Sequence, residues 1–244
     1  MDSTALDVDD GAEVAFRRAG REDEAIAQFR RVRGESLIAA TPWRTFRWHY
    51  GQKHYSGTYW AATEAGHIIY ESRLELARLL FADFDRSVKR IAAQPFLLRT
   101  TVDGRMCRHV PDFLLLTEEG PIVVDVKPAA RLSVPAVQFT FEWTRRLVES
   151  RGWRYQVWTE PDAVELANIR FLAGYRRSWL FGEPVTSALR ASVVSGMTVD
   201  EAVRSASEFP ATVVRSGLLH LLWRQVFLVD VSQVLQSTSI IEVK

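Results

Sequence analysis

Residues 109–128 read HVPDFLLLTEEGPIVVDVKP and hold the clearest structural pattern in the chain. Two apolar runs, residues 113–116 and 122–126, are separated by a TEEG segment with the composition of a turn. Pro128 has no backbone N–H to give to a sheet, so the second run ends at Lys127. The pattern predicts a β-hairpin.

Charged residues stand at the end of this apolar hairpin. Side chains alternate across a strand, so Asp125 and Lys127 project from one face, and Val124 and Val126 from the other. Charged side chains are rarely buried without a partner or a metal. Carboxylate oxygens suit Mg²⁺, and one or two such ions can assist phosphodiester hydrolysis. We therefore expect Asp112 and Asp125 to bind Mg²⁺, or Mn²⁺ in its place, with Lys127 beside the scissile phosphate or the attacking water.

A second interpretation of the hairpin needs no metal. In it, Asp125 and Lys127 form an exposed ion pair that contributes little to stability. Against it, the order Pro-Asp, then Asp-x-Lys on the following strand, resembles the PD-(D/E)xK nuclease superfamily.

Composition restricts the other classes of function. The chain has 244 residues, 47% of them apolar, which allows one large domain or two small ones. Its net charge is only +1, so nucleic acid would have to bind at a local basic patch. Cys107 is the only cysteine, which excludes an internal disulfide and a thiolate zinc site and favours a reducing cytoplasm. The longest apolar stretch, near residues 218–229, is interrupted by His220 and Arg224, so we expect no membrane span.

Basic and aromatic residues alternate within residues 41–60. Arg44, Arg47 and Lys53 lie among Phe, Trp and Tyr, and Gly51 and Gly57 supply turns, which predicts the strands of a hairpin. Such a surface suits phosphate contact with base stacking, and it suits ordinary cross-strand pairs equally well. Four further arginines are candidates for contact with DNA: Arg145, Arg146, Arg176 and Arg177.

A helix is predicted over residues 70–84. Five apolar residues recur at helical spacing and define its buried face: Leu74, Ala77, Leu80, Phe81 and Phe84. Glu75 borders that face and is a natural further metal ligand, with Glu71 one turn earlier as a supporting residue. The alternative is a surface helix whose glutamates pair with Arg78. Gln94, in the turn that follows, either orients a group near the site or is a simple loop amide.

The remaining segments predict three regions. Residues 1–40 would be an acidic, frayed tail over residues 1–10 and two short helices over residues 13–33. Residues 41–182 would be an α/β (α+β) domain with a mixed sheet, including a helix over 135–151 and a strand over 155–159. Residues 183–244 would be a winged-helix-like domain of three helices and a terminal hairpin, residues 226–231 and 238–243. There, Leu218, Leu222 and Trp223 would either form a docking surface for a partner or fill the domain's own core.

Five short blocks extend the resemblance to a specific family. They are TPW at 41–43, LELA at 74–77, QPF at 94–96, DFL at 112–114 and VKPAA at 126–130. Their order and spacing resemble TnsA, the endonuclease subunit of heteromeric transposases, over about residues 41–175. The resemblance implies a restriction-endonuclease-like fold and Mg²⁺-dependent cleavage of the 5′ strand at transposon ends. It also implies a DDE-type transposase partner and an ATP-dependent regulator that engages the C-terminal domain.

The resemblance assigns roles to individual residues. Glu75 matches the first acidic ligand, Asp112 the second and Lys127 the catalytic lysine. Asp125 stands where the best-known member has glutamine and where the wider superfamily has Asp or Glu, and Glu71 has no matching role. Two other functions remain open at this point: a stand-alone restriction or repair nuclease, and a catalytically idle DNA-binding scaffold subunit. Idle relatives usually lose an acidic ligand or the lysine, and here all four residues are present.

Overall fold

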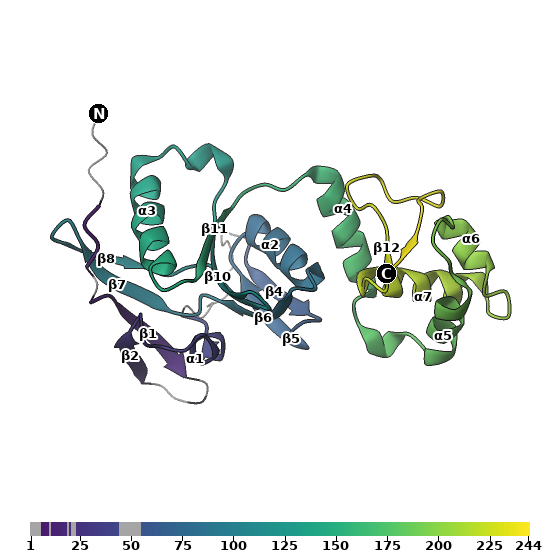
Figure 1. The fold of residues 1–244 in the computed structure, drawn as a ribbon, viewed down its shortest axis with the longest axis horizontal. Helices are drawn as coiled ribbons and strands as arrows, with labels where there is room; N and C mark the ends of the chain where they lie inside the picture. Colours follow the sequence, from purple (N-terminus) through teal and green to yellow (C-terminus); the bar gives the residue numbers. More distant parts are fainter. Residues whose placement is uncertain (1–5, 10, 19, 21–22, 44–54) are drawn as a thin grey trace. The chain divides into compact units, whose positions relative to one another are not determined.

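The chain folds into two compact units in the computed structural model, which describes residues 6–9, 11–18, 20, 23–43 and 55–244 (Figure 1). One unit comprises Met1–Asp83 and Ser87–Glu160, and the other comprises Phe84–Arg86 and Pro161–Lys244. The boundary predicted between residues 182 and 183 therefore falls inside the second unit.

A four-stranded mixed sheet contains the predicted hairpin. Its strand order is β11 (Arg154–Trp158), β10 (Gly120–Val126), β9 (Phe113–Thr117) and β6 (Val88–Ala93). β9 and β10 pair antiparallel, with Phe113 opposite Val124 and Thr117 opposite Gly120, so the predicted hairpin is confirmed. β10 and β11 pair parallel, which requires a crossover, and the helix α3 (Pro135–Glu149) provides it.

The N-terminal region forms part of a second sheet instead of the two predicted helices. This five-stranded sheet consists of β1 (Glu13–Arg18), β2 (Glu24–Gln28), β3 (Ala40–Thr41), β7 (Leu97–Val102) and β8 (Arg105–His109). β1 pairs with β2, β3 and β7, so it is a central strand and buries Val14, Ala15 and Phe16 in succession. A continuous apolar run is typical of a strand covered on both faces, and over so short a length it cannot be told from a helix by periodicity. A short helix, α1 (Gly34–Ile38), follows β2.

Residues 7–9 of the acidic N-terminal segment are also more ordered than predicted. Val8 forms an isolated antiparallel bridge with Val102, and the Asp9 backbone N–H donates to the Thr101 carbonyl at 3.0 Å. Residues 7–9 therefore add to the sheet beside β7, and the prediction of a frayed tail is wrong for them.

A small hairpin precedes the helix that carries Glu75. β4 (Gly57–Ala61) pairs with β5 (Gly66–Tyr70), and α2 (Arg73–Phe84) follows. Gly57 begins β4 instead of forming a turn. Glycine is needed there because a Cβ atom would lie 2.5 Å from the Tyr70 hydroxyl oxygen. The rest of the hairpin predicted over residues 41–60 lies mainly outside the described residues.

Buried Asp83 fixes the β4–β5 turn to α2. Its carboxylate accepts hydrogen bonds from the Tyr59 hydroxyl at 2.7 Å, from the backbone N–H of Ala62 at 3.0 Å, and from the backbone and hydroxyl of Thr63 at 2.7 and 2.8 Å. The buried face of α2 is consequently displaced from the predicted one. Ala77 and Leu80 are buried as predicted, but so are Arg78, Leu79, Ala82 and Asp83, while Leu74, Phe81 and Phe84 are only half-buried.

One hydrophobic core joins the two larger sheets of the first unit. It contains Phe16 of β1, Leu98 of β7, Leu114 of β9 and Val123 of β10, with Trp143 of α3 packed against them. The core therefore locks the hairpin between the larger sheet and α3, and the predicted mixed α/β architecture is confirmed.

The second unit is mainly helical. Its elements are α4 (Ala163–Leu172), α5 (Glu183–Ser192), α6 (Val199–Arg204), α7 (Ala211–Trp223), β12 (Phe227–Leu228) and β13 (Glu242–Val243). Thr198 and Glu201 form the predicted capping box of α6. Gly217 allows α7 to approach α5, because a Cβ atom there would lie 3.0 Å from a methyl group of Val185.

The terminal hairpin of this unit is shorter than predicted. β12 and β13 pair over only two residues each, and the loop between them is held by Asn168, whose amide donates to the carbonyls of Val231 and Gln233 at 2.8 and 2.6 Å. Within residues 183–244 the three helices α5, α6 and α7 and a hairpin are thus present, and the winged-helix assignment stays a prediction. Over the described part of the chain, no helix has the length and apolar character needed to cross a membrane.

Candidate active site

Two carboxylates lie at one end of the β9–β10 hairpin. Asp112 immediately precedes β9. Asp125 is the penultimate residue of β10, and only 2% of its surface is exposed. The Asp112 carboxylate accepts a hydrogen bond from the backbone N–H of Val126 at 2.7 Å. The hairpin register therefore brings both acids to the same edge of the sheet.

Asp125 is held by two side chains from other strands. Nε2 of His109, the last residue of β8, lies 2.8 Å from both carboxylate oxygens. The hydroxyl of Tyr155, in β11, donates to Asp125 Oδ2 at 2.5 Å. A carboxylate buried this deeply is expected to have such partners, because an isolated buried charge is costly.

Glu75 reaches the site from the first turn of α2. Its carboxylate accepts a hydrogen bond from the backbone N–H of Glu71 at 2.8 Å and one from the Ser72 hydroxyl at 2.9 Å, and Ser72 in turn accepts from the Glu75 backbone at 3.1 Å. These reciprocal bonds have the form of a helix-capping arrangement. They fix the start of α2 and direct Glu75 and Glu71 to the same pocket.

A pocket of about 540 Å³ collects these residues. Its lining includes Glu71, Glu75, Arg108, His109, Asp112, Asp125 and Lys127. Lys127 follows β10, and its backbone N–H donates to the Trp158 carbonyl at 2.9 Å, which extends the β10–β11 ladder by one residue. Asp125 and Lys127 thus share a face, as strand alternation predicts, and they line a pocket instead of an open surface.

The charges of the pocket are unbalanced. The pKa of Asp112 is raised well above its usual value, first by burial and then by the negative charges of Asp125 and Glu75, while the Val126 hydrogen bond and Lys127 oppose the shift. Burial is also the main cause of the raised pKa of Glu75. The pKa of Tyr155 is raised by burial and by Asp125, so its hydroxyl keeps its proton and remains a donor. Four acids line the pocket with one lysine and one arginine, and a bound cation would relieve this excess of negative charge.

The donor set suits a hard divalent cation. Carboxylate oxygens are the ligands that Mg²⁺ prefers, and Asp112, Asp125 and Glu75 present them around one space. Among the residues that the structure describes, no three His, Cys, Asp or Glu side chains are already arranged as a metal cage. The oxygens of Asp125 and Glu75 also accept hydrogen bonds from protein donors, and a carboxylate keeps further lone pairs for a cation.

The other residues predicted for the site have different positions. Gln94 is buried and supports the site through its backbone: its N–H donates to the Asp112 carbonyl at 2.8 Å, and its carbonyl accepts from the Trp43 N–H at 2.8 Å. Arg44, Arg47 and Lys53 lie outside the described residues.

The predicted basic pairs are engaged within their own units. Arg145 pairs with Glu149 at 3.4 Å and Arg146 with Glu142 at 2.7 Å, along α3. Arg176 donates to the Ala173 carbonyl at 2.5 Å, and the Arg177 guanidinium lies 5.7 Å from the centre of the Trp179 ring.

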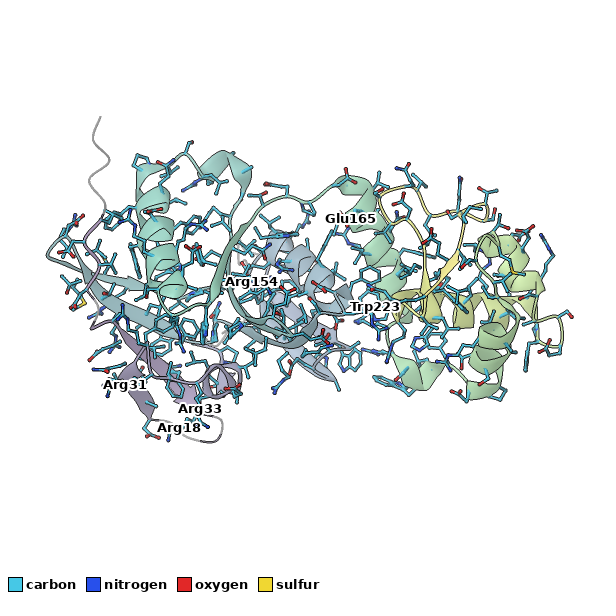
Figure 2. All side chains as sticks on the ribbon, viewed as in Figure 1. Arg18, Arg31, Arg33, Arg154, Glu165 and Trp223 are labelled. Atoms are coloured by element: carbon cyan, nitrogen blue, oxygen red, sulfur yellow. The ribbon has the colours of Figure 1, made fainter. Side chains whose placement is uncertain are left out.

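The predicted docking residues of the second unit are buried. Leu218, Leu222 and Trp223 are 0%, 2% and 3% exposed (Trp223 is labelled in Figure 2). The docking surface proposed from the sequence is therefore wrong for these three residues. They fill the interior because α7 is the central helix, with α4, α5 and α6 packed around it.

Three residues at the site were not predicted from the sequence: His109 and Arg108, which line the pocket, and Tyr155, whose hydroxyl bonds to Asp125. His109 lies within the hairpin stretch itself, three residues before Asp112, but its partner Asp125 becomes evident only when β8 is placed beside β10. Arg108 is exposed, and the structure records no ion pair or hydrogen bond between it and another described side chain. Basic residues interspersed through β8 were the available signal.

Part of this chain matches a family of known proteins. Residues 85–160 match the family model described as TnsA-like endonuclease N terminal, and this segment contains Asp112, Asp125, Lys127, His109 and Tyr155. A comparison with curated proteins gave no significant match. The family match thus confirms, over residues 85–160, that this chain resembles the TnsA-type endonucleases of transposition.

Proposed function

We propose that this protein is a Mg²⁺-dependent DNA endonuclease subunit of a heteromeric transposase, which cuts the 5′ strand at transposon ends. The similarity of residues 85–160 to TnsA-like endonucleases supports a nuclease of the transposase type. The observation that carries the catalytic part of the proposal is the meeting of Asp112, Asp125, Glu75 and Lys127 in one pocket.

Each residue has a role that follows from its chemistry. Asp112, Asp125 and Glu75 would hold one or two Mg²⁺ ions, or Mn²⁺ in their place, through carboxylate oxygens. Bound Mg²⁺ would supply an activated water and stabilise negative charge on the phosphate oxygens. Lys127 would place its ammonium beside the scissile phosphate, where it offsets the charge that develops as the water oxygen joins phosphorus and the bond to the leaving ester oxygen breaks.

The substrate would be double-stranded DNA, and the pocket needs cations at its rim to admit a phosphate. Arg108 lines the pocket and is exposed, so it can offer its guanidinium to the DNA backbone. Arg18, Arg31 and Arg33 do not line the pocket and are exposed on the β1–β2–α1 part of the same unit (Figure 2). Arginines of this kind give affinity without sequence selectivity.

Selection of the transposon end would come from protein partners. We place a DDE-type transposase and an ATP-dependent regulator in this role, in the cytoplasm of a bacterial cell, on the strength of the family resemblance. The regulator would contact the second unit, through surface residues and not through the buried face of α7.

The test is a nicking assay on DNA that carries the transposon end, with and without the partner proteins. With Mg²⁺, Asp112→Ala and Lys127→Ala should each reduce cleavage by roughly 100-fold or more. Glu119→Ala is the matched control, because Glu119 is an exposed acid of the same hairpin. EDTA should stop cleavage and Mg²⁺ or Mn²⁺ restore it, while Ca²⁺ should support binding with poor turnover.

Three results would argue against the proposal. Cleavage that persists in EDTA would exclude the metal mechanism, and full activity of folded Asp112→Ala would remove that residue from the site. Efficient cleavage of plain duplex DNA by the chain alone would instead favour a stand-alone nuclease.

A further inference from the structure

The acids at the end of the hairpin must be held together against their mutual repulsion. Asp112 and Asp125 carry like charges around one small space, and the hairpin itself holds the Asp112 carboxylate through the Val126 N–H at 2.7 Å. Asp125 receives its restraint from elsewhere, through contacts of 2.8, 2.8 and 2.5 Å made by His109 and Tyr155. The position of Asp125 is thus determined by two residues that are not among the four acids and lysine of the pocket.

The His109 ring is itself held on several sides. Its backbone pairs with Leu98 of β7, so the residue belongs to the five-stranded sheet, whereas Asp125 belongs to the four-stranded one. The imidazole meets the indole of Trp143 edge-on, with ring centres 6.1 Å apart and planes at 86°. Trp143 is 1% exposed, so the ring has little freedom to turn. His109 therefore connects the two sheets at the site.

The Tyr155 ring approaches Asp125 from β11, the strand that pairs in parallel with β10. Tyr155 pairs with Val123 in the parallel β10–β11 ladder and is 7% exposed. Its ring contacts Phe141 of α3 with centres 6.4 Å apart, and the Arg145 guanidinium lies 5.1 Å from the ring centre. A buried phenol needs an acceptor for its hydroxyl, and Asp125 is that acceptor.

We infer that His109 and Tyr155 are positioning residues that fix the Asp125 carboxylate for a divalent cation. This inference rests on the proposed function, because it assumes that Asp125 is a metal ligand. An ionised carboxylate offers about four lone-pair sites. The donors from His109 and Tyr155 leave capacity for a cation while they restrict rotation of the carboxylate. Hydrogen-bond partners of metal ligands commonly change metal affinity by roughly 10- to 100-fold when they are removed.

The test measures Mn²⁺ binding to the full chain, without DNA, by isothermal titration calorimetry. His109→Ala and Tyr155→Phe should each raise the Kd for Mn²⁺ by roughly 10- to 100-fold. His109→Gln should recover most of the affinity, because the glutamine amide can place an N–H at a similar reach. His67→Ala is the matched control, since His67 is an exposed histidine of β5 outside the pocket, and its Kd should equal that of the parent protein.

The outcomes separate this inference from the proposed function. Unchanged Mn²⁺ affinity in folded His109→Ala and Tyr155→Phe would overturn the positioning role, although the parent protein would still bind Mn²⁺ in a manner that depends on Asp112. Tighter binding by His109→Ala would overturn it as well, since His109 would then compete with the metal. No Asp112-dependent binding by the parent protein would overturn both. If His109→Ala unfolds by circular dichroism, Tyr155→Phe decides the question, because it removes a single oxygen atom.

Discussion

Replacement of Asp112 by Asn should make the protein more stable at neutral pH while it abolishes cleavage. The side chains have nearly the same shape, and the Asn carbonyl oxygen can still accept from the Val126 N–H that bonds Asp112 at 2.7 Å. The substitution removes one negative charge from a pocket that also holds Asp125 and Glu75. The active site is thus expected to be a place where function costs stability.

The size of the gain follows from two opposing effects. At an effective dielectric constant of about 20, two like charges repel by about 4 kcal/mol at a separation of about 4 Å and by less at larger separations. Loss of the charge weakens the Val126 hydrogen bond by about 1 kcal/mol. A net gain of about 1–2 kcal/mol remains, and each kcal/mol corresponds to a Tm change of roughly 2–4 °C in a protein of this size.

The pH dependence of stability provides a second test of whether Asp112→Asn stabilises the protein. Burial and the neighbouring acids raise the pKa of Asp112 in the folded state, so the folded protein binds this proton more tightly than the unfolded chain does. The resulting stability is fully present below the usual carboxyl pKa and is lost as pH rises through the folded-state pKa of Asp112. The advantage of Asp112→Asn should therefore grow with pH across that window and then remain constant.

The assay is urea unfolding from pH 4 to pH 8 in EDTA, followed by Mg²⁺ addition. The control, Glu119→Gln, removes the same charge from an exposed side chain and should change stability by less than about 0.5 kcal/mol. Mg²⁺ should stabilise the parent protein more than Asp112→Asn, because a ligand of the folded state raises its stability. The reasoning fails if Asp112→Asn is no more stable than the parent protein at pH 8 without metal.

Other consequences can be tested independently. Arg108→Ala should weaken binding to all duplex DNA sequences alike. It should also reduce the slope of log K against log salt concentration by about 0.9, the contribution of one phosphate contact. A slope identical to that of the parent protein would show that Arg108 does not contact the DNA. Asp83→Ala should lower the free energy of unfolding by about 3 kcal/mol, since it removes the acceptor of four hydrogen bonds, and Tyr59→Phe should lower it by about 1 kcal/mol. Urea denaturation measures both, and a loss below about 1 kcal/mol for Asp83→Ala would show that water replaces the carboxylate.

The hairpin and its acids could be predicted because the information for them is local. Strand alternation, a four-residue turn and a terminal proline are all contained in one short stretch, and they bring Asp112, Asp125 and Lys127 to one edge. Glu75 could be predicted from helical spacing together with the family resemblance. Its role in capping α2 was not foreseen, although the order Ser72, then Glu75, is the pattern of a capping box.

The N-terminal sheet could not be predicted because its partners are distant in sequence. Val14, pressed against Leu98 by the β1–β7 pairing, looks the same in a helix or a strand until β7 is placed beside it. Likewise, His109 and Tyr155 show no sequence feature that points to Asp125. Their contacts arise only when the fold brings β8 and β11 close to the end of β10. The burial of Asp83 could not be predicted either. A charged residue in an apolar helix is expected to be exposed unless its hydrogen-bond donors are known.

The parallel pairing of β10 with β11 has a consequence for the order of folding. The antiparallel β9–β10 hairpin closes a short loop, whereas Tyr155 lies 30 residues beyond Asp125 and reaches it only after α3 has crossed over. Short loops close with less entropy loss, so we expect the acidic pair to come together early and its Tyr155 restraint to form late. Tyr155→Phe should then accelerate unfolding and leave the refolding rate nearly unchanged in stopped-flow experiments. A protein built in this order would assemble its repelling acids first and immobilise them last.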